Sequence, residues 1–134
     1  MDIERRVRIN RVMKTPTEIE RGLMDLKRLP KDAGALFCMK ETRRHVFWMK
    51  NTYVSLDLIF LDEVFRVVGT LTGAIPHDET PLQVDTPSKY IIEIKSGYVD
   101  AHDIQVGNII RPKYNPIKKS TKKRRTPRAK NGPL

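Results

Sequence analysis

The stretch HVFWMKNTYVSLDLIFLD, residues 45–62, is the densest apolar segment of the chain, although it contains a lysine, an asparagine and an aspartate. Its alternation of residue types predicts two strands, at residues 45–50 and 55–62, joined by a turn at Asn51-Thr52. Alternate side chains of a strand face opposite sides of a sheet. Asp57 would therefore point the same way as the apolar Ile59 and away from solvent.

A buried carboxylate is costly without partners, so Asp57 needs hydrogen-bond donors or a cation. The neighbouring turn could supply them through the backbone N–H groups of residues 51–53, the Thr52 hydroxyl or Lys50. Two interpretations stay open. Asp57 and Asn51 could lock the hairpin, or they could rim a pocket for a small polar ligand together with Trp48 and Lys50.

Glu93 is a second candidate for a buried carboxyl group and a second candidate pocket residue. It is the only acidic residue within KYIIEIK, residues 89–95, and it would share a face with Ile91 and Lys95. The simplest interpretation pairs it with a basic residue on the neighbouring strand.

The rest of the chain predicts one early helix and several short strands. Thr15-Pro16-Thr17-Glu18 is typical of a helix start, with a capping box and a proline in the first turn, and this helix would run to about Met24. Further strands are expected at residues 4–14, 35–39, 66–72, 89–97 and 104–112, with a polar turn at 41–44 and loops at 29–34 and 73–87. This pattern predicts an α+β fold, mostly antiparallel, with a curled sheet or small partly closed barrel and one N-terminal helix.

The net charge of +10 is concentrated at one end of the chain, which divides it into a domain and a tail. Residues 1–110 hold 16 basic and 16 acidic side chains and would form a single compact, mostly-β domain of net charge zero. Residues 111–134 hold no acid and ten basic residues: Arg111, Lys113, Lys118, Lys119, Lys122, Lys123, Arg124, Arg125, Arg128 and Lys130.

This basic tail contains four prolines and few large apolar residues, so we expect it to be disordered when alone. Dense positive charge favours phosphate binding through counterion release, and the expected partner is RNA or DNA. An acidic protein surface and an address signal remain alternatives.

The sequence favours no catalytic residue, metal or cofactor. Its three histidines are scattered, and Cys38 is the only cysteine, with a Cys38–His45 pair as the one nucleophilic alternative. We interpret His77, Asp78 and Glu79 as solvent-exposed charged and polar residues of the loop, with weak cation binding as the alternative. The chain shows neither a signal peptide nor an 18-residue apolar run, so we expect a cytoplasmic protein that does not contact membranes.

Several motifs resemble the domain of unknown function 192, an uncharacterised family of small proteins. The similarity rests on FWMKNT (47–52) followed by LDLIF (56–60), with GLM (22–24), GALF (34–37), IIEIKSG (91–97) and IQVGNII (104–110) in the same order. The resemblance implies a compact, mostly-β domain with one helix, and no activity. The positions that match the family's motif residues are Gly22, Leu23, Met24, Gly34, Phe37, Trp48, Met49, Lys50, Asn51, Thr52, Leu56, Asp57, Phe60, Glu93, Gly97 and Gly107. The chain departs from the family pattern at Ala35, Ser55 and Asn108, where methionine, proline and aspartate are usual.

Three functional hypotheses follow. The favoured one is a non-enzymatic accessory or binding protein, anchored to nucleic acid or a nucleoprotein assembly by its basic tail. The second is a small-ligand-binding protein or an enzyme with a pocket at Trp48, Lys50, Asn51 and Asp57. The third is a structural component of a virus particle or another large assembly.

Overall fold

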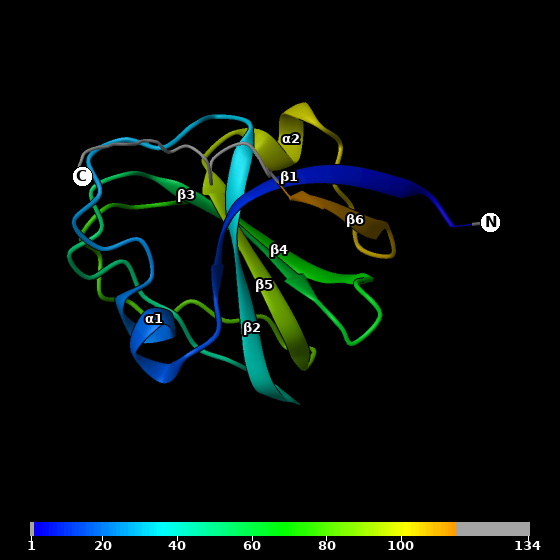
Figure 1. Ribbon diagram of the computed structural model, residues 1–134, viewed down its shortest axis with the longest axis horizontal. Coiled ribbons are helices and arrows are strands. Elements are labelled where there is room, and N and C mark those ends of the chain that lie inside the picture. Colours follow the sequence, from blue (N-terminus) through cyan, green and yellow to red (C-terminus); the bar gives the residue numbers. More distant parts are fainter. Residues whose placement is uncertain (1, 115–134) are drawn as a thin grey trace, which may run out of the picture.

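The computed structural model describes residues 2–114, and residues 115–134, which carry most of the basic tail, lie outside the described part of the chain. The described part contains six strands and two short helices (Figure 1). In chain order these are β1 (Glu4–Met13), α1 (Pro16–Arg21), β2 (Ala33–Arg43), β3 (Leu56–Leu61), β4 (Val67–Ala74), β5 (Ser88–Lys95), α2 (Tyr98–Ala101) and β6 (Ile109–Tyr114).

The six strands form one curled sheet in the order β4-β3-β5-β2-β1-β6. The β4–β3, β3–β5 and β5–β2 pairings are antiparallel, whereas β1 runs parallel to both β2 and β6. The sheet curls until its two ends meet. Arg66, just before β4, pairs with Ile109 of β6, and the Val67 N–H donates to the Asn108 carbonyl at 2.8 Å. The expected α+β fold with a curled, partly closed sheet is confirmed.

Both faces of the sheet are covered, as the runs of apolar residues in β3 and β5 predict. All six residues of β3 are buried. On one face Ile59, Ile92 and Ile94 pack with Tyr98 and Val99 of α2. On the other face the buried cluster includes Leu23, Phe37, Met49, Leu58 and Phe60, with Ile19 of α1 and Phe47 packed against it. The second face, beneath α1 and the segment that follows β2, holds the candidate site.

Helix α1 begins as its capping box predicts. The Glu18 N–H donates to Thr15 Oγ1 at 3.1 Å, and the Thr15 N–H donates to Glu18 Oε1 at 3.0 Å. The helix ends at Arg21 instead of near Met24, because Gly22 takes a positive φ of 52° that glycine tolerates better than other residues. The chain then turns toward the sheet, and Leu23 is buried.

The expected strand at residues 45–50 is wrong. Only Phe47 takes part in a bridge, to Leu82, with reciprocal N–H to carbonyl hydrogen bonds of 2.9 and 2.8 Å. The rest of the segment is irregular. Met49 is nonetheless buried and Trp48 exposed, because the segment lies over one face of the sheet with alternate side chains inward. The side chains of this segment do alternate between buried and exposed, but without the hydrogen-bond ladder of a strand.

Two other strand limits differ from the sequence prediction, and one helix was not predicted. Residues 41–43, expected in a turn, continue β2, and their exposed polar side chains explain why they resemble a turn. The last strand begins at Ile109 instead of residue 104 and runs to Tyr114, so the expected domain boundary at residue 110 falls within β6. The one-turn helix α2, which was not predicted, follows Gly97 at a φ of 101°.

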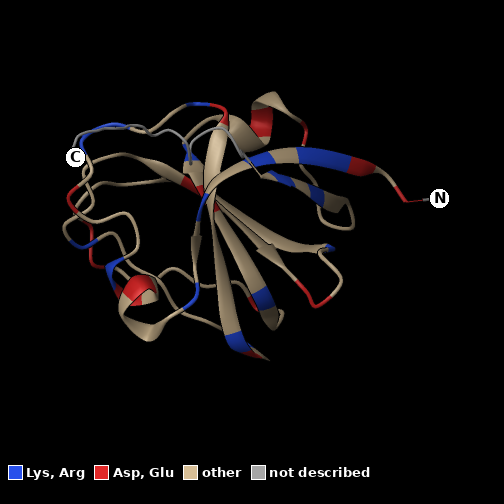
Figure 2. Cartoon of the chain, viewed as in Figure 1, with Lys and Arg blue, Asp and Glu red and all other residues tan. Residues whose placement is uncertain are grey.

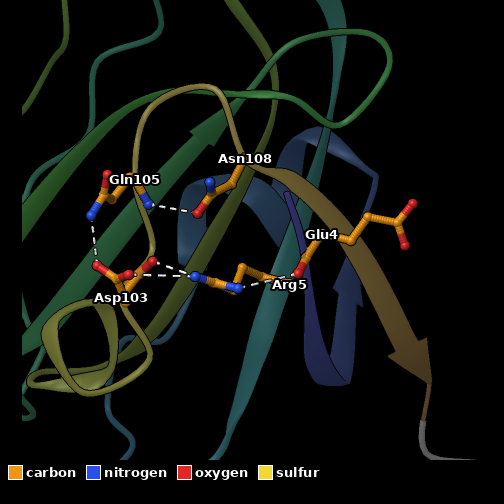
Figure 3. A network of polar contacts seen from close by, with 5 residues as sticks. All are labelled: Glu4, Arg5, Asp103, Gln105 and Asn108. Atoms are coloured by element: carbon orange, nitrogen blue, oxygen red, sulfur yellow. Dashed lines mark hydrogen bonds and ion pairs between the residues drawn. The ribbon is translucent and has the colours of Figure 1, made fainter. Parts of the chain in front are cut away.

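Polar side chains fasten the start of β1 to the turn that precedes β6 (Figure 3). Arg5 donates to the Asp103 carbonyl at 3.3 Å and forms an ion pair with its carboxylate at 3.4 Å. Asp103 also accepts from the Gln105 amide at 2.6 Å, and the Gln105 N–H donates to the Asn108 side chain at 2.9 Å. These contacts support the parallel β1–β6 pairing that extends the sheet.

Candidate ligand-binding site

Glu93 lies in the middle of β5 among apolar neighbours. Its cross-strand neighbours are Ala35 of β2 and Leu58 of β3, so the expected pairing with a basic residue is wrong. The side chain is 6% exposed. Within the described residues its carboxyl group has neither a hydrogen-bond donor nor a cation as a partner.

Burial without compensation changes the protonation of Glu93. Desolvation disfavours the charged carboxylate and raises the pKa of Glu93 from 4.5 to about 8. The group is therefore mostly a neutral carboxylic acid at pH 7. A carboxylic acid offers one O–H donor and one carbonyl acceptor side by side.

A cavity of about 240 Å³ opens beside Glu93, and we call it the Glu93 cavity. It is enclosed by the end of α1 and the turn after it, by β2, by residues 45–52 and by β5. Its lining residues are Ile19, Glu20, Arg21, Gly22, Leu23, Met24, Phe37, Met39, Arg43, His45, Val46, Phe47, Trp48, Thr52 and Glu93.

The cavity has apolar walls interrupted by buried polar side chains, and its mouth is charged. Leu23 and Phe37 are buried, and the Phe47 ring meets the Phe37 ring edge to face at a centroid distance of 5.8 Å. Arg21 and Arg43 are exposed members of the lining. Glu20 is a third exposed charged residue of the lining, and Arg21 forms an ion pair with Asp25 at 3.3 Å. An anionic group on a bound molecule would therefore meet Arg43, which has no ion-pair partner among the described residues.

His45 and Thr52 are buried polar members of the lining, and each is held by a backbone carbonyl. His45 Nε2 lies 2.8 Å from the Glu41 carbonyl, and the Thr52 hydroxyl donates to the Lys50 carbonyl at 3.0 Å. Because a carbonyl only accepts, Nε2 carries the proton. Nδ1 of a neutral His45 is then an acceptor.

The residues proposed from sequence do not form one site. Trp48 and Glu93 line the same cavity. Lys50 and Asn51 line a neighbouring open hollow that also reaches Trp48, where the Lys50 ammonium lies 5.1 Å from the Trp48 ring centroid. Asn51 has a φ of 53°, and its carbonyl accepts from the Asp25 N–H at 2.9 Å. Asn51 therefore shapes a turn at the edge of the cavity.

Asp57 belongs to the core and not to the cavity. The side chain is fully buried, and its carboxylate accepts backbone N–H groups of Gly73 at 3.0 Å, Gly97 at 3.1 Å and Val99 at 2.9 Å. These donors differ from those expected at residues 50–53. They join β3 to the end of β4 and to the start of α2, which is a structural role.

Sequence reasoning did not single out Arg21, Phe37, Arg43 or Phe47 as site residues, and it considered His45 only as a partner of Cys38. They lie on separate segments, and no spacing in the chain links them. The family resemblance was a partial signal, because seven of its residues line the cavity: Gly22, Leu23, Met24, Phe37, Trp48, Thr52 and Glu93.

The other candidate residues do not come together. Cys38 packs on the opposite face of the sheet from the cavity that His45 lines, so the two do not form a nucleophilic pair. Partial burial raises the pKa of the Cys38 thiol. Among residues 2–114, no group of three or more His, Cys, Asp or Glu side chains is placed to hold a metal ion, and neither helix is long and apolar enough to cross a bilayer.

The fold and the cavity define a class of protein, a small curled-sheet domain with a buried carboxyl group facing a cavity between the sheet and a short helix. The chain belongs to the domain of unknown function 192 family (DUF192), described as an uncharacterized ACR, whose model matches residues 3–112.

Two solved structures are similar to the chain. One, from Novosphingobium aromaticivorans DSM 12444, is a protein of unknown function with 33% identity and a TM-score of 0.69, and the match covers 72% of this chain and 69% of that one. The other, from Sinorhizobium meliloti 1021, is described provisionally as a transcription regulator, with 32% identity, a TM-score of 0.70 and coverage of 72% and 74%. No curated protein matches the chain.

Proposed function

We propose that the domain binds a small organic molecule in the Glu93 cavity. The observation that carries the proposal is a buried carboxyl group that has no partner among residues 2–114 and faces a cavity with apolar walls and a few polar side chains. A buried polar group that no protein group satisfies costs stability. Strongly shifted carboxyl groups in cavities are characteristic of functional sites.

The chemistry of the cavity defines the ligand class. A neutral carboxylic acid pairs best with an uncharged group that both donates and accepts a hydrogen bond, such as an amide or a hydroxyl. The cavity volume of about 240 Å³ lies below the range of drug-sized pockets. We therefore infer a compact ligand with an apolar body, an amide or hydroxyl head at Glu93 and its outer end near Arg43.

A thermal-shift screen of the full chain with small amides and alcohols, including benzamide and cyclohexanol, tests this proposal. Ligands that bind only the folded protein raise its melting temperature. Glu93→Leu should fold and lose the response, while Glu93→Gln should keep it, because glutamine also donates and accepts. Glu63→Leu, the same change on the exposed β3–β4 turn, is the matched control. If Glu93→Leu responds as the wild type does, the cavity is not the site.

We also propose that the basic residues at 111–130 anchor the protein to nucleic acid. The concentration of ten basic residues and no acid in this part of the chain supports this second function. One similar structure is described provisionally as a transcription regulator, which is compatible with it. Residues 115–134 lie outside the described part of the chain, so the support comes from their sequence alone.

The tail proposal is tested in the full chain by replacing Lys118, Lys119, Lys122, Lys123, Arg124 and Arg125 with glutamine. RNA and DNA affinity should fall, and the dependence of the binding constant on salt should become shallower. Unchanged affinity and salt dependence would exclude the tail as the anchor. The expectations of an acidic protein partner and of a role in a virus particle or other large assembly stay predictions.

A further inference from the structure

The outer face of β1 and β6 carries a row of basic side chains. In the parallel register of these strands Arg6 lies beside Arg111 and Arg8 beside Lys113, and all four side chains are exposed. Lys and Arg positions are blue along both strands in Figure 2. Like charges directly opposite each other on a sheet destabilise it. Arg111 is already paired with Glu4 at 2.7 Å, and Arg8 lies 3.9 Å from Asp32, so an anion bound across the two strands would chiefly meet Arg6 and Lys113.

A hollow of about 190 Å³ lies against this row, and we call it the basic hollow. Its lining residues are Arg6, Arg8, Asp32, Tyr98, His102 and Lys113. Asp32 is its one acid and lies 3.9 Å from Arg8, with both side chains more than half exposed. Arg6 and Lys113 have no ion-pair partner among the described residues, so the hollow has a net positive charge.

An aromatic surface completes the hollow. The His102 ring stacks on the Tyr98 ring with a centroid distance of 3.8 Å and an interplanar angle of 16°. Tyr98 is buried, whereas His102 is exposed, so the His102 face turned away from Tyr98 meets solvent. A cationic groove beside an aromatic ring is the combination with which proteins bind single-stranded nucleic acids.

We propose that the basic hollow binds the sugar–phosphate backbone of single-stranded nucleic acid, with His102 stacking on a base. The inference rests partly on the proposed tail function, because Lys113 lies five residues before Lys118, where the densest run of basic residues begins. The folded domain and the tail would then follow one strand of nucleic acid together. Arg8 and Arg111 already form ion pairs with Asp32 and Glu4. Arg6 and Lys113 would therefore make the phosphate contacts.

Fluorescence anisotropy with labelled oligouridylate and oligothymidylate of about 16 nucleotides tests the proposal in the full chain. The test variant is Arg6→Gln/Lys113→Gln. The matched control is Arg28→Gln/Lys40→Gln, which removes an exposed arginine and lysine outside the hollow. Affinities are measured across about 50 to 200 mM salt, where counterion release is resolved.

The test variant should lower the salt slope by about 1.4, because each lost phosphate contact on a single strand contributes about 0.7. The control should leave the slope nearly unchanged. His102→Ala should weaken binding about fivefold or more without changing the slope, since stacking is not ionic. Equal losses in the test and control variants would overturn the proposal, as would tighter binding to polyglutamate than to either oligonucleotide.

The tail variant separates this inference from the proposed tail function. If the tail variant loses binding and Arg6→Gln/Lys113→Gln does not, the tail is the anchor and the hollow proposal is wrong. If the reverse holds, the hollow is the site and the tail proposal is wrong. If the unmodified chain binds neither oligonucleotide, both are wrong.

Discussion

Asp57 and Glu93 are both buried acidic residues on neighbouring strands, and their surroundings give them opposite roles. Asp57 accepts three backbone N–H groups, whereas Glu93 has no donor among the described residues. The sequence predicted that both side chains face inward. It could not reveal their partners. The donors to Asp57 are the backbone N–H groups of residues 73, 97 and 99. The lack of a donor near Glu93 depends on its neighbours in β2 and β3, which are distant in the chain.

Glu93→Gln should change how stability depends on pH. The pKa of Glu93 rises from 4.5 to about 8 on folding, so the folded state holds the extra proton between these values. Wild-type stability contributed by this group is therefore greatest below about pH 4.5 and is lost as the pH rises to about 8. Relative to wild type, Glu93→Gln should gain up to roughly 3–5 kcal/mol between pH 5 and pH 9.

Urea unfolding of both proteins across this pH range measures the gain. The exposed Glu63→Gln variant, which should track wild type, is the control. If the curves for wild type and Glu93→Gln stay parallel from pH 5 to pH 9, Glu93 does not have the raised pKa.

Asp57→Asn should destabilise the fold strongly. An asparagine amide offers one acceptor oxygen and would turn N–H donors toward backbone N–H groups that need an acceptor. We expect a loss of roughly 3–5 kcal/mol, as for breaking one partner of a buried charged network. Denaturant unfolding at neutral pH checks this, and a loss below about 1 kcal/mol would show that the three hydrogen bonds are not structural.

Helix α1 shows what local sequence can and cannot specify. Its start was predictable, because the capping box is a short-range pattern within residues 15–18. The segment at 45–50 was not, because its alternation has the period of a strand although it pairs only at Phe47. The missed helix α2 is a single turn whose first N–H groups are held by Asp57, so it depends on tertiary contacts.

Thr15→Ala should remove the cap of α1 and cost about 1 kcal/mol of folding free energy. Thr17→Ala, in the same first turn but at a residue that makes no capping hydrogen bond, is the control and should change stability by less than about 0.5 kcal/mol. Urea unfolding compares the two. Since Ile19, Glu20 and Arg21 of α1 line the Glu93 cavity, Thr15→Ala should also weaken ligand binding. Equal effects of the two substitutions would contradict the role of the cap.

In the whole domain, most of the sheet could be predicted from the sequence, whereas the cavity forms only when distant segments come together in the fold. Apolar runs in β3 and β5 predicted strands covered on both faces, and the turn residues predicted most of the strand order along the chain. The parallel position of β1 between β2 and β6, and the contact of Arg66 with Ile109 that partly closes the sheet, have no local signal. The Glu93 cavity draws on four separate segments, and of the five pocket residues predicted from the sequence only Trp48 and Glu93 line it.

The same topology places two binding surfaces on different parts of the domain. The Glu93 cavity lies between α1 and the sheet, and the basic hollow lies on the outer face of β1 and β6 beside α2. No residue lines both. We therefore expect small-molecule binding and nucleic-acid binding to be separable by substitution.

The affinity of the full chain for the best small amide, measured by calorimetry at about pH 6 and about pH 9, tests the central claim most directly. Recognition by the neutral carboxylic acid predicts about tenfold weaker binding at the higher pH, because a group with a pKa of about 8 is then mostly ionised. Glu93→Gln should bind equally at both pH values, and Glu93→Leu should bind at neither. Equal wild-type affinity at both pH values, or undiminished binding by Glu93→Leu, would contradict it.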